Sequence, residues 1–244
     1  ICKQLNIDTK KYKERTFLNA ISSAKDELKT PEQYADEVAK EYNKKIFGRV
    51  YKEYQKRLKQ NNALDFDDLI MLTVQLFRQN AEILNHYQER FPFILVDEYQ
   101  DTNTAQFTLL SLLASRYQNL CVVGDDDQSI YRFRGANIHN ILNFEKIFPA
   151  TKVIRLEQNY RSTKNILAAA SGVIKHNSMR KEKTLWTTAE AGAPISYGRY
   201  DNEYEEAQGI AADIHRQVKD GMSYSDFAIL YRTNAVSYTH LTLP

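Results

Sequence analysis

Two adjacent carboxylates, Asp97 and Glu98, directly follow the apolar run 93–96. A nucleoside triphosphatase needs such a pair, since one carboxylate holds Mg²⁺, usually through water, while the other orients or deprotonates the attacking water. Taken alone the pattern is weak evidence, because an Asp-Glu pair after a strand is more often a solvated turn or a helix cap. The catalytic interpretation therefore depends on other segments.

A second polar stretch, residues 124–135, combines acidic, amide, aromatic and arginine side chains. The amide of Gln128 lies between an acidic turn and an Arg-aromatic-Arg run, so it is suited to sense a γ-phosphate while neighbouring rings stack on bases. A surface turn followed by an amphipathic strand is the simpler alternative.

A third stretch, residues 158–163, places an aromatic ring and an arginine directly before a helix. Tyr160 is suited to stack on adenine, and Arg161 to stabilise charge in the transition state as an arginine finger. The alternative is an ordinary helix start.

These polar stretches follow segments that read as strands, and strands alternate with helices along the body of the chain. The expected strands are 93–96, 120–123, 152–156, 195–200 and 227–231, and the expected helices are 83–90, 105–113, 138–148, 165–174 and 203–218. Continuous apolar runs predict strands buried on both faces of a parallel sheet, and the alternation predicts an α/β fold. Ligands of such sheets bind at the carboxyl ends of the strands, where the three polar stretches lie.

The N-terminal sixty residues read as helical. Thr30 and Pro31 predict a helix start, and an apolar residue every four positions predicts one long helix over 30–58 with its apolar stripe in the core. Further on, Asp65 or Asp67 is expected to cap another helix.

Charge is distributed unevenly. Residues 1–60 hold 15 Lys and Arg against 9 Asp and Glu, whereas the rest of the chain holds 18 against 22, giving +6 and −4. A basic module that touches a polyanion would show this pattern, and so would a solvated lysine-rich helix face.

The three polar stretches, in their order and spacing, resemble motifs II, III and IV of the UvrD/Rep/PcrA-like superfamily 1 DNA helicases. The motif-bearing segments are 96–103, 124–135 and 158–163, and 65–69 and 229–235 also resemble family segments. The similarity covers nearly the whole chain. It implies a RecA-like fold of the P-loop NTPase type, with parallel sheets flanked by helices and an all-helical insertion domain at the N-terminal end.

The resemblance also implies domain boundaries. Residues 1–62 correspond to the helical insertion domain, which contacts duplex DNA in the family. Residues 63–157 correspond to the C-terminal part of the first RecA-like ATPase domain, and 158–235 to the beginning of the second. Residues 236–244 match no motif and are interpreted as an assembly artefact, with a lineage-specific turn as the alternative.

Family members are ATP-driven motors that move 3′ to 5′ on single-stranded DNA, with ATP held between two RecA-like domains. By this resemblance Asp97 holds Mg²⁺ through water and Glu98 activates the attacking water. Tyr160 stacks on the adenine, and Arg161 completes the nucleotide pocket. The implied cofactors are ATP and Mg²⁺.

The resemblance assigns DNA contacts as well. Gln128 and Arg134 would couple the γ-phosphate to the DNA site, with both side chains in the nucleotide-binding set. Tyr131 and Phe133 would face single-stranded DNA. Many relatives carry Trp at the position of Phe133, but phenylalanine still offers a ring face, and stacking is worth about 1–3 kcal/mol per base.

One required element is missing. No glycine in the sequence is followed by lysine, so the G-x-x-x-x-G-K-S/T loop that cradles phosphates is not present. We expect this loop upstream of Ile1 and motifs V and VI downstream of Pro244. The chain is therefore interpreted as an internal fragment that does not hydrolyse ATP alone.

Composition excludes several other classes of protein. With 43% hydrophobic and 26% charged residues the chain is not a disordered or low-complexity protein, and its apolar runs are too short to span a bilayer. Cys2 and Cys121 lack metal-ligand spacing, which favours a reducing, cytoplasmic location without a zinc site.

Two other functions remain open. One is a non-catalytic DNA-binding or regulatory module that has lost its phosphate loop, and the other is the motor portion of a helicase-nuclease. A non-hydrolysing module has no physical need to keep Asp97, Glu98 and Arg161 together, so a truncated helicase is the favoured interpretation. The expected partners are single-stranded and duplex DNA, with no membrane.

Overall fold

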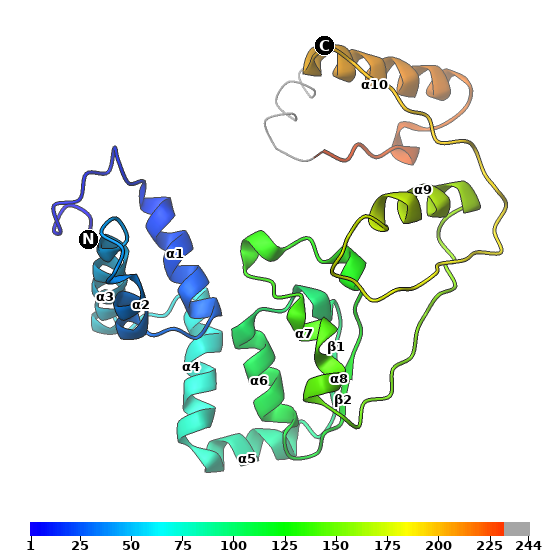
Figure 1. Ribbon diagram of the computed structural model, residues 1–244. Helices are drawn as coiled ribbons and strands as arrows, with labels where there is room; N and C mark the ends of the chain where they lie inside the picture. Colours follow the sequence, from blue (N-terminus) through cyan, green and yellow to red (C-terminus); the bar gives the residue numbers. More distant parts are fainter. Residues whose placement is uncertain (232–244) are drawn as a thin grey trace. The chain divides into compact units, whose positions relative to one another are not determined.

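The computed structural model describes residues 1–231, so the tail 236–244 and the end of segment 229–235 lie outside the described residues. The chain divides into two compact units (Figure 1). Unit 1 contains residues 1–158 and 171–185, and unit 2 contains 159–170 and the chain from 186 onward.

Helices dominate both units. The helices are α1 (Glu14–Asp26), α2 (Pro31–Val38), α3 (Lys45–Gln60), α4 (Phe66–Gln79), α5 (Ala81–Arg90), α6 (Thr104–Ala114), α7 (His139–Leu142), α8 (Phe144–Ile147), α9 (Lys164–Ile174) and α10 (Glu203–Lys219), and the strands are β1 (Ile94–Val96) and β2 (Leu120–Val122). None of the helices within residues 1–231 has the length and apolar character needed to cross a membrane.

The single helix expected over 30–58 is wrong, because the chain forms α2 and α3 with a turn at 39–44. The predicted start is confirmed: Thr30 caps α2, and its hydroxyl accepts a hydrogen bond from the Gln33 backbone N–H at 3.3 Å. Folding back lets the apolar stripe of one helix cover that of the other. Gly48 permits this close approach, since a Cβ there would lie 2.8 Å from the Ala35 Cα.

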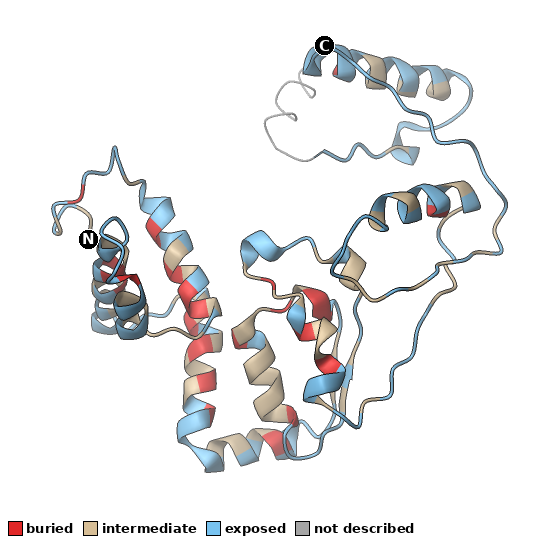
Figure 2. Cartoon of the chain, in the orientation of Figure 1, coloured by how far each residue is buried: buried red, intermediate tan, exposed pale blue. Residues whose placement is uncertain are grey.

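The helical part of unit 1 has a core of its own, marked red in Figure 2. Phe17 and Ile21 of α1 pack with Val50 and Tyr51 of α3, and the Tyr51 side chain is fully buried. The Tyr51 hydroxyl donates a hydrogen bond to the Lys29 carbonyl at 3.0 Å. This core joins helices that are distant in sequence.

A buried ion cluster connects α1 to the start of α4. The Lys25 ammonium lies 2.6 Å from a carboxylate oxygen of Asp65 and 2.8 Å from one of Asp68, and its side chain has no solvent exposure. Asp65, rather than Asp67, is the N-cap of α4, and its side chain accepts from the Asp68 backbone N–H at 2.8 Å. Helix capping and charge pairing therefore use the same carboxylate.

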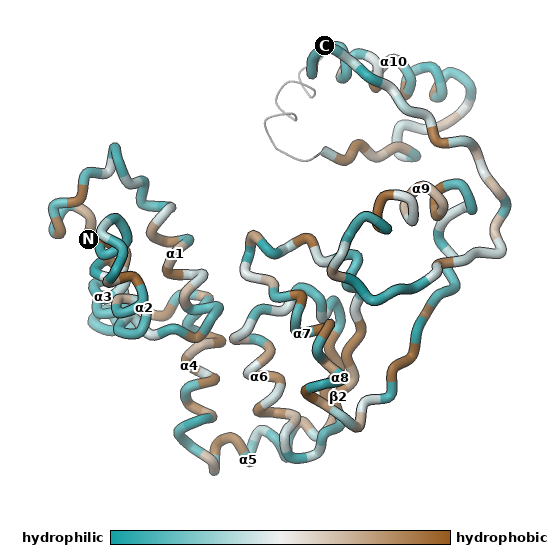
Figure 3. The backbone as a smooth tube through the Cα atoms, viewed as in Figure 1, coloured by the Kyte–Doolittle hydropathy of each residue, from teal (hydrophilic) through white to brown (hydrophobic). Residues whose placement is uncertain are grey.

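The sheet is smaller than expected. Strands β1 and β2 pair in parallel with Ile94 opposite Leu120, which confirms the predictions at 93–96 and 120–123. The strands expected at 152–156, 195–200 and 227–231 are wrong, because no strand forms there within the described residues. A strand needs a neighbour for its backbone hydrogen bonds, and no strand within residues 1–231 pairs with these apolar segments. Figure 3 shows hydrophobic residues along β2.

The expected burial of the strands on both faces is also wrong. Leu95, in the middle of β1, is 79% exposed. The two-stranded sheet leaves one face of this strand without a covering layer. The observed fold is therefore helix-rich with a small parallel sheet.

Most of the other expected helices form. Helices α5, α6, α9 and α10 confirm the predictions at 83–90, 105–113, 165–174 and 203–218. The helix expected over 138–148 is broken into α7 and α8, since Asn143 leaves helical geometry at φ −99° and ψ 7°.

Unit 2 is held together partly by hydrogen bonds between two separate stretches of chain. The Asn159 N–H donates to the Trp186 carbonyl at 2.8 Å. The Asn165 side-chain amide donates to the carbonyls of Gly192 and Ala193 at 3.0 and 3.2 Å. These bonds fix the loop before α9, which carries two of the predicted site residues.

Candidate functional site

The turn after β1 presents the predicted carboxylate pair. Asp97 and Glu98 are both exposed, and the Glu98 N–H donates to the Asp97 carboxylate at 2.9 Å. Glu98 has a left-handed backbone, with φ 50° and ψ 39°. Such strain in a residue other than glycine costs on the order of 1–3 kcal/mol and is concentrated at functional sites. The strain is consistent with a turn that is built to aim Glu98.

Gln100 organises this turn, and we assigned it no role from the sequence. It is almost fully buried, its amide donates to the Glu98 carboxylate at 2.7 Å, and its carbonyl oxygen accepts from the Asp125 N–H at 3.0 Å. One side chain thus links the turns that follow β1 and β2. The signal in the sequence was its place in the motif-bearing segment 96–103. In the structure Gly124 makes room for this side chain, since a Cβ there would lie 2.6 Å from the Gln100 side-chain oxygen.

An open pocket of about 390 Å³ lies beside this turn. Asp97, Glu98 and Asp101 bring three carboxylates to its lining. Burial raises the pKa of Asp101, and the Glu98 charge adds to the effect. One Asp101 carboxylate oxygen is buried and has no hydrogen-bond partner among residues 1–231.

These residues fit a hydrated Mg²⁺ better than a directly coordinated metal. Within residues 1–231 no group of three or more His, Cys, Asp or Glu side chains has the geometry to hold a metal ion. Mg²⁺ usually keeps several waters and takes one or two carboxylates together with substrate phosphates. The exposed carboxylate of Asp97 is a suitable acceptor for such waters.

The turn after β2 holds Gln128. Its side-chain amide donates to the Asp125 carboxylate at 2.8 Å, and Asp125 in turn donates from its backbone N–H to Gln100. The structure therefore brings Glu98 and Gln128 into one hydrogen-bonded network through two residues. The sequence predicted both ends of this network but not the connection.

Arg134 lies among the predicted DNA-facing rings. Its guanidinium lies 5.1 Å from the ring centre of Tyr131 and 5.5 Å from that of Phe133. The two rings are tilted, with centres 6.1 Å apart. Phe133 is 70% exposed, so its ring is available for stacking. A contact of Arg134 with a γ-phosphate stays a prediction.

Tyr160 and Arg161 lie in unit 2, in the loop before α9. The Asn159 carboxamide oxygen accepts from the N–H groups of Arg161 and Ser162, at 3.0 and 2.8 Å. This turn leaves Tyr160 and Arg161 exposed. Their roles toward nucleotide stay predictions.

Comparison with known proteins agrees with these motifs. Residues 1–149 match the family model of the UvrD/REP helicase N-terminal domain, and residues 154–240 match that of the UvrD-like helicase C-terminal domain. The chain belongs to the UvrD/REP helicase family. The predicted resemblance is thereby confirmed.

Relatives in this family include proteins named ATP-dependent DNA helicase PcrA. The protein from Bacillus subtilis strain 168 is 56% identical over 238 residues, and that from Staphylococcus aureus strain NCTC 8325 is 54% identical over 237 residues. Each match covers 97% of this chain but only 32% of the relative. The chain thus spans about a third of the length of these UvrD/REP family members.

The family boundary and the structural boundary differ. The C-terminal family domain begins its match at residue 154, yet the structure groups residues 171–185 with unit 1. A segment of the C-terminal UvrD-like domain therefore packs with the turn after β2, which carries Gln128.

Proposed function

We propose that this chain is part of an ATP-dependent DNA helicase. Such a helicase couples ATP hydrolysis to 3′ to 5′ movement on single-stranded DNA and to duplex unwinding. Membership of the UvrD/REP family and the names of its PcrA relatives support this. The observation that carries the proposal is the network from Glu98 through Gln100 and Asp125 to Gln128. Through this network a movement of Glu98 can affect Gln128, and a movement of Gln128 can affect Glu98.

Of the two carboxylates after β1, Asp97 is assigned to the cation and Glu98 to the attacking water. Asp97 would hold Mg²⁺ through water, and the ion would supply charge neutralisation on the phosphates. Glu98 accepts the proton of the attacking water, and the hydrogen bond from Gln100 orients its carboxylate. Fixing the base in this way lowers the reorganisation needed at reaction.

We assign two further nucleotide contacts to the loop before α9. Tyr160 stacks on the adenine, and Arg161 stabilises the negative charge that develops on the phosphate. Their exposure and the fixed turn at Asn159 support this assignment. Gln128 senses the γ-phosphate, since a neutral amide can donate to it without neutralising it.

Single-stranded DNA binds over the aromatic pair. The exposed ring of Phe133 stacks on a base, and Arg134, beside both rings, adds positive charge toward the DNA backbone. Tyr131 lies beside the same guanidinium, 5.1 Å away, with its ring centre 6.1 Å from that of Phe133. Stacking accepts any base, as a motor that moves along DNA requires.

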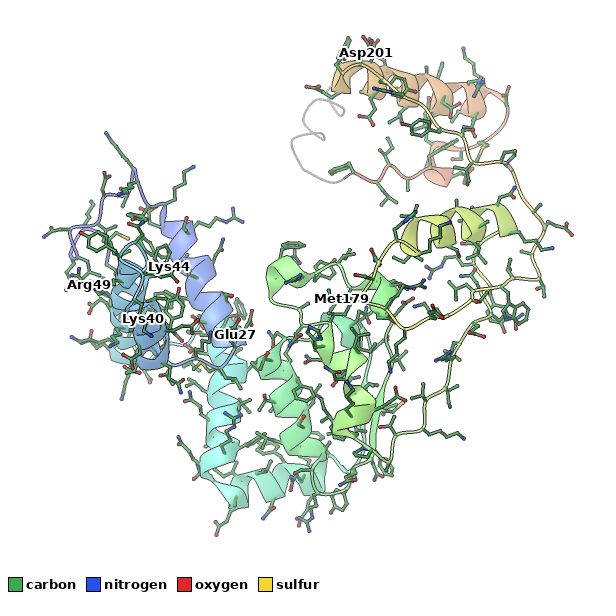
Figure 4. All side chains as sticks on the ribbon, in the orientation of Figure 1. Glu27, Lys40, Lys44, Arg49, Met179 and Asp201 are labelled. Atoms are coloured by element: carbon green, nitrogen blue, oxygen red, sulfur yellow. The ribbon has the colours of Figure 1, made fainter. Side chains whose placement is uncertain are left out.

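Residues 1–62 form the helical insertion domain and contact duplex DNA. The excess of positive charge lies on α3 and on the loops, since α1 is neutral and α2 is acidic. Figure 4 labels Lys40 and Lys44 of the turn 39–44 and Arg49 of α3. Such side chains would neutralise phosphates of the DNA backbone, so the affinity for duplex DNA should fall steeply as the salt concentration rises.

A hybrid protein tests the catalytic proposal. The matching segment of the Bacillus subtilis PcrA is replaced by residues 1–235 of this chain, and DNA-stimulated ATP hydrolysis and unwinding of a 3′-tailed duplex are measured. Glu98→Gln should lower hydrolysis by about 10²- to 10⁴-fold, the usual contribution of a general base. Glu82→Gln on exposed α5 is the matched control. Hydrolysis that survives Glu98→Gln would contradict the proposal.

Fluorescence anisotropy with a labelled single-stranded oligonucleotide tests the DNA platform. In the hybrid, Phe133→Ala should weaken binding by roughly 5- to 150-fold, equivalent to about 1–3 kcal/mol of base stacking. Phe93→Ala is the control, because Phe93 is 71% exposed but lies beside the sheet. Equal losses from both variants would remove the special role of Phe133. Binding without any ATP hydrolysis would instead favour a non-catalytic DNA-binding module.

A further inference from the structure

A short basic segment, residues 180–183, lies against the acidic turn 125–127 of unit 1. Arg180 makes two parallel hydrogen bonds to the Asp127 carboxylate, both 2.8 Å. The Lys183 ammonium lies 3.1 Å from Asp127 and is also ion-paired with Asp125. Figure 4 labels Met179, which immediately precedes this segment.

The backbone of the basic segment takes part too. The Lys181 N–H donates to the Asp126 carboxylate at 2.7 Å, so each of the three acidic side chains has a partner here. The Asp126 and Asp127 side chains are about nine-tenths buried, with 9% and 10% exposure. Three adjacent, shielded carboxylates would repel one another without these partners.

Charge pairing outweighs burial in this cluster. Burial alone would raise the pKa of Asp125. Hydrogen bonds and nearby charge, of which the hydrogen bond from Lys183 has the largest effect, hold the pKa of that carboxyl below its usual value. Burial likewise opposes charge on Lys183, and the hydrogen bonds to Asp125 and Asp127 nevertheless raise its pKa. Both groups are therefore charged at neutral pH, and the interaction is ionic.

Asp125 connects this cluster to the candidate site. One carboxylate oxygen pairs with Lys183 and accepts from the Asp127 N–H at 2.9 Å, while the other accepts from the Gln128 amide at 2.8 Å. The Asp125 N–H donates to Gln100, which holds Glu98. In this continuous network only Asp125 lies between Lys183 and Gln128. Two residues, Asp125 and Gln100, lie between Lys183 and Glu98.

The cluster also joins the two family domains. The acidic turn belongs to the N-terminal match at residues 1–149, whereas Arg180 and Lys183 belong to the C-terminal match at 154–240. All of these residues lie in unit 1. The C-terminal family domain therefore contributes side chains directly to the turn that carries Gln128.

We propose that Arg180 and Lys183 are positioning residues for ATP hydrolysis, forming a basic clamp that fixes the Asp125 carboxylate and, through it, Gln128 and Glu98. This inference rests on the proposed function. Neither side chain reaches a reacting atom in this network; each acts by holding the acidic turn.

Hydrogen exchange on the full chain tests the clamp without any activity measurement. Lys183→Met should speed amide exchange in peptides covering 98–101 and 125–128 by about tenfold, because the Asp125 carboxylate loses its ionic partner. Lys175→Met is the matched control, since Lys175 is exposed and has no ion pair in the described part of the chain. Unchanged exchange at 125–128 in Lys183→Met would overturn the inference.

Kinetics of the hybrid helicase test the consequence for catalysis. Lys183→Met should lower kcat for ATP hydrolysis by about 10- to 100-fold with less than about a twofold change in the KM for ATP, as expected for a misplaced catalytic group. Lys183→Arg should recover most of kcat because it keeps the charge. A loss shared by Lys175→Met, or no recovery in Lys183→Arg, would overturn the positioning role.

Different results would contradict the proposed function and the clamp. A folded hybrid without substitutions that hydrolyses no ATP would contradict the proposed function. The exchange measurement then decides the clamp alone: faster exchange in Lys183→Met supports it, and unchanged exchange overturns it.

Discussion

Two parts of unit 1 hold their shape by different means. The helical part buries Phe17 and Tyr51 almost completely, whereas the middle of β1 leaves Leu95 79% exposed. At the ends of the strands, fixed geometry comes from polar contacts such as those of Gln100 and Asp125. The candidate site is therefore held by a hydrogen-bonded network in addition to buried rings such as Tyr99, whose centre lies 5.4 Å from that of Phe144.

This difference has consequences for stability and function. Removing an apolar side chain from the helical core should cost much stability, because a cavity remains. Removing a link in the polar network should cost less stability but more activity, since an unsatisfied partner moves the site.

Tyr51→Ala should produce the largest loss. The side chain is fully buried in the helical core and donates to the Lys29 carbonyl, so its removal leaves a cavity and an unpaired acceptor. We expect the free energy of unfolding to fall by about 3–5 kcal/mol. Urea unfolding followed by circular dichroism measures this, with Tyr42→Ala, an exposed tyrosine, as the control. Similar losses from both variants would remove the distinction between core and surface.

Gln100→Ala should have an intermediate effect. It removes the amide that donates to Glu98 and accepts from the Asp125 N–H. The cost in unfolding free energy should be about 1–3 kcal/mol, that of leaving a buried polar partner unsatisfied. ATP hydrolysis by the hybrid should fall by about 10- to 100-fold through loss of positioning. A large stability loss with unchanged hydrolysis would assign Gln100 to the core alone.

Asp26 should give stability a measurable pH dependence. Burial raises its pKa to about 6 from 3.8, with the charges of Asp67 and Glu27 adding to the shift, and its carboxylate accepts from Asn103 at 2.6 Å. The folded state therefore favours the protonated form, so this contribution is favourable below about pH 4 and is lost as pH rises through 6.

Asp26→Asn tests this contribution. The wild-type chain should lose roughly 1–3 kcal/mol between pH 4 and pH 7 relative to the variant, in unfolding free energies measured by urea titration at several pH values. The asparagine keeps an acceptor for Asn103 but cannot titrate. Parallel pH curves for the two proteins would contradict the assignment.

The sequence patterns predicted local structure better than they predicted packing. The cap at Thr30, helices α5, α6 and α10, and both strands that form were visible as spacing and composition. The turn at 39–44 was not visible, because an apolar residue every fourth position fits one long helix and two packed helices equally well. Only the tertiary contact at Gly48 distinguishes them.

The site followed the same rule. Asp97, Glu98 and Gln128 are site residues predicted from the motifs, but the network that joins Glu98 to Gln128 depends on Gln100 and Asp125, which contact each other across 25 positions of sequence. Arg180 and Lys183 were missed entirely, since a basic run after a helix usually indicates a solvated surface. Their meaning appears only when the acidic turn is placed against them.

The smallest effect should come from the exposed strand, and it tests the comparison most directly. If β1 contributes hydrogen bonds but little apolar burial, Leu95→Thr should change the unfolding free energy by less than about 0.5 kcal/mol, as for other surface substitutions. Threonine keeps strand propensity, so the pairing with Cys121 should survive. Urea unfolding measures the change. A loss above about 2 kcal/mol would show that apolar packing at β1 supports the site as strongly as the helical core supports its own helices.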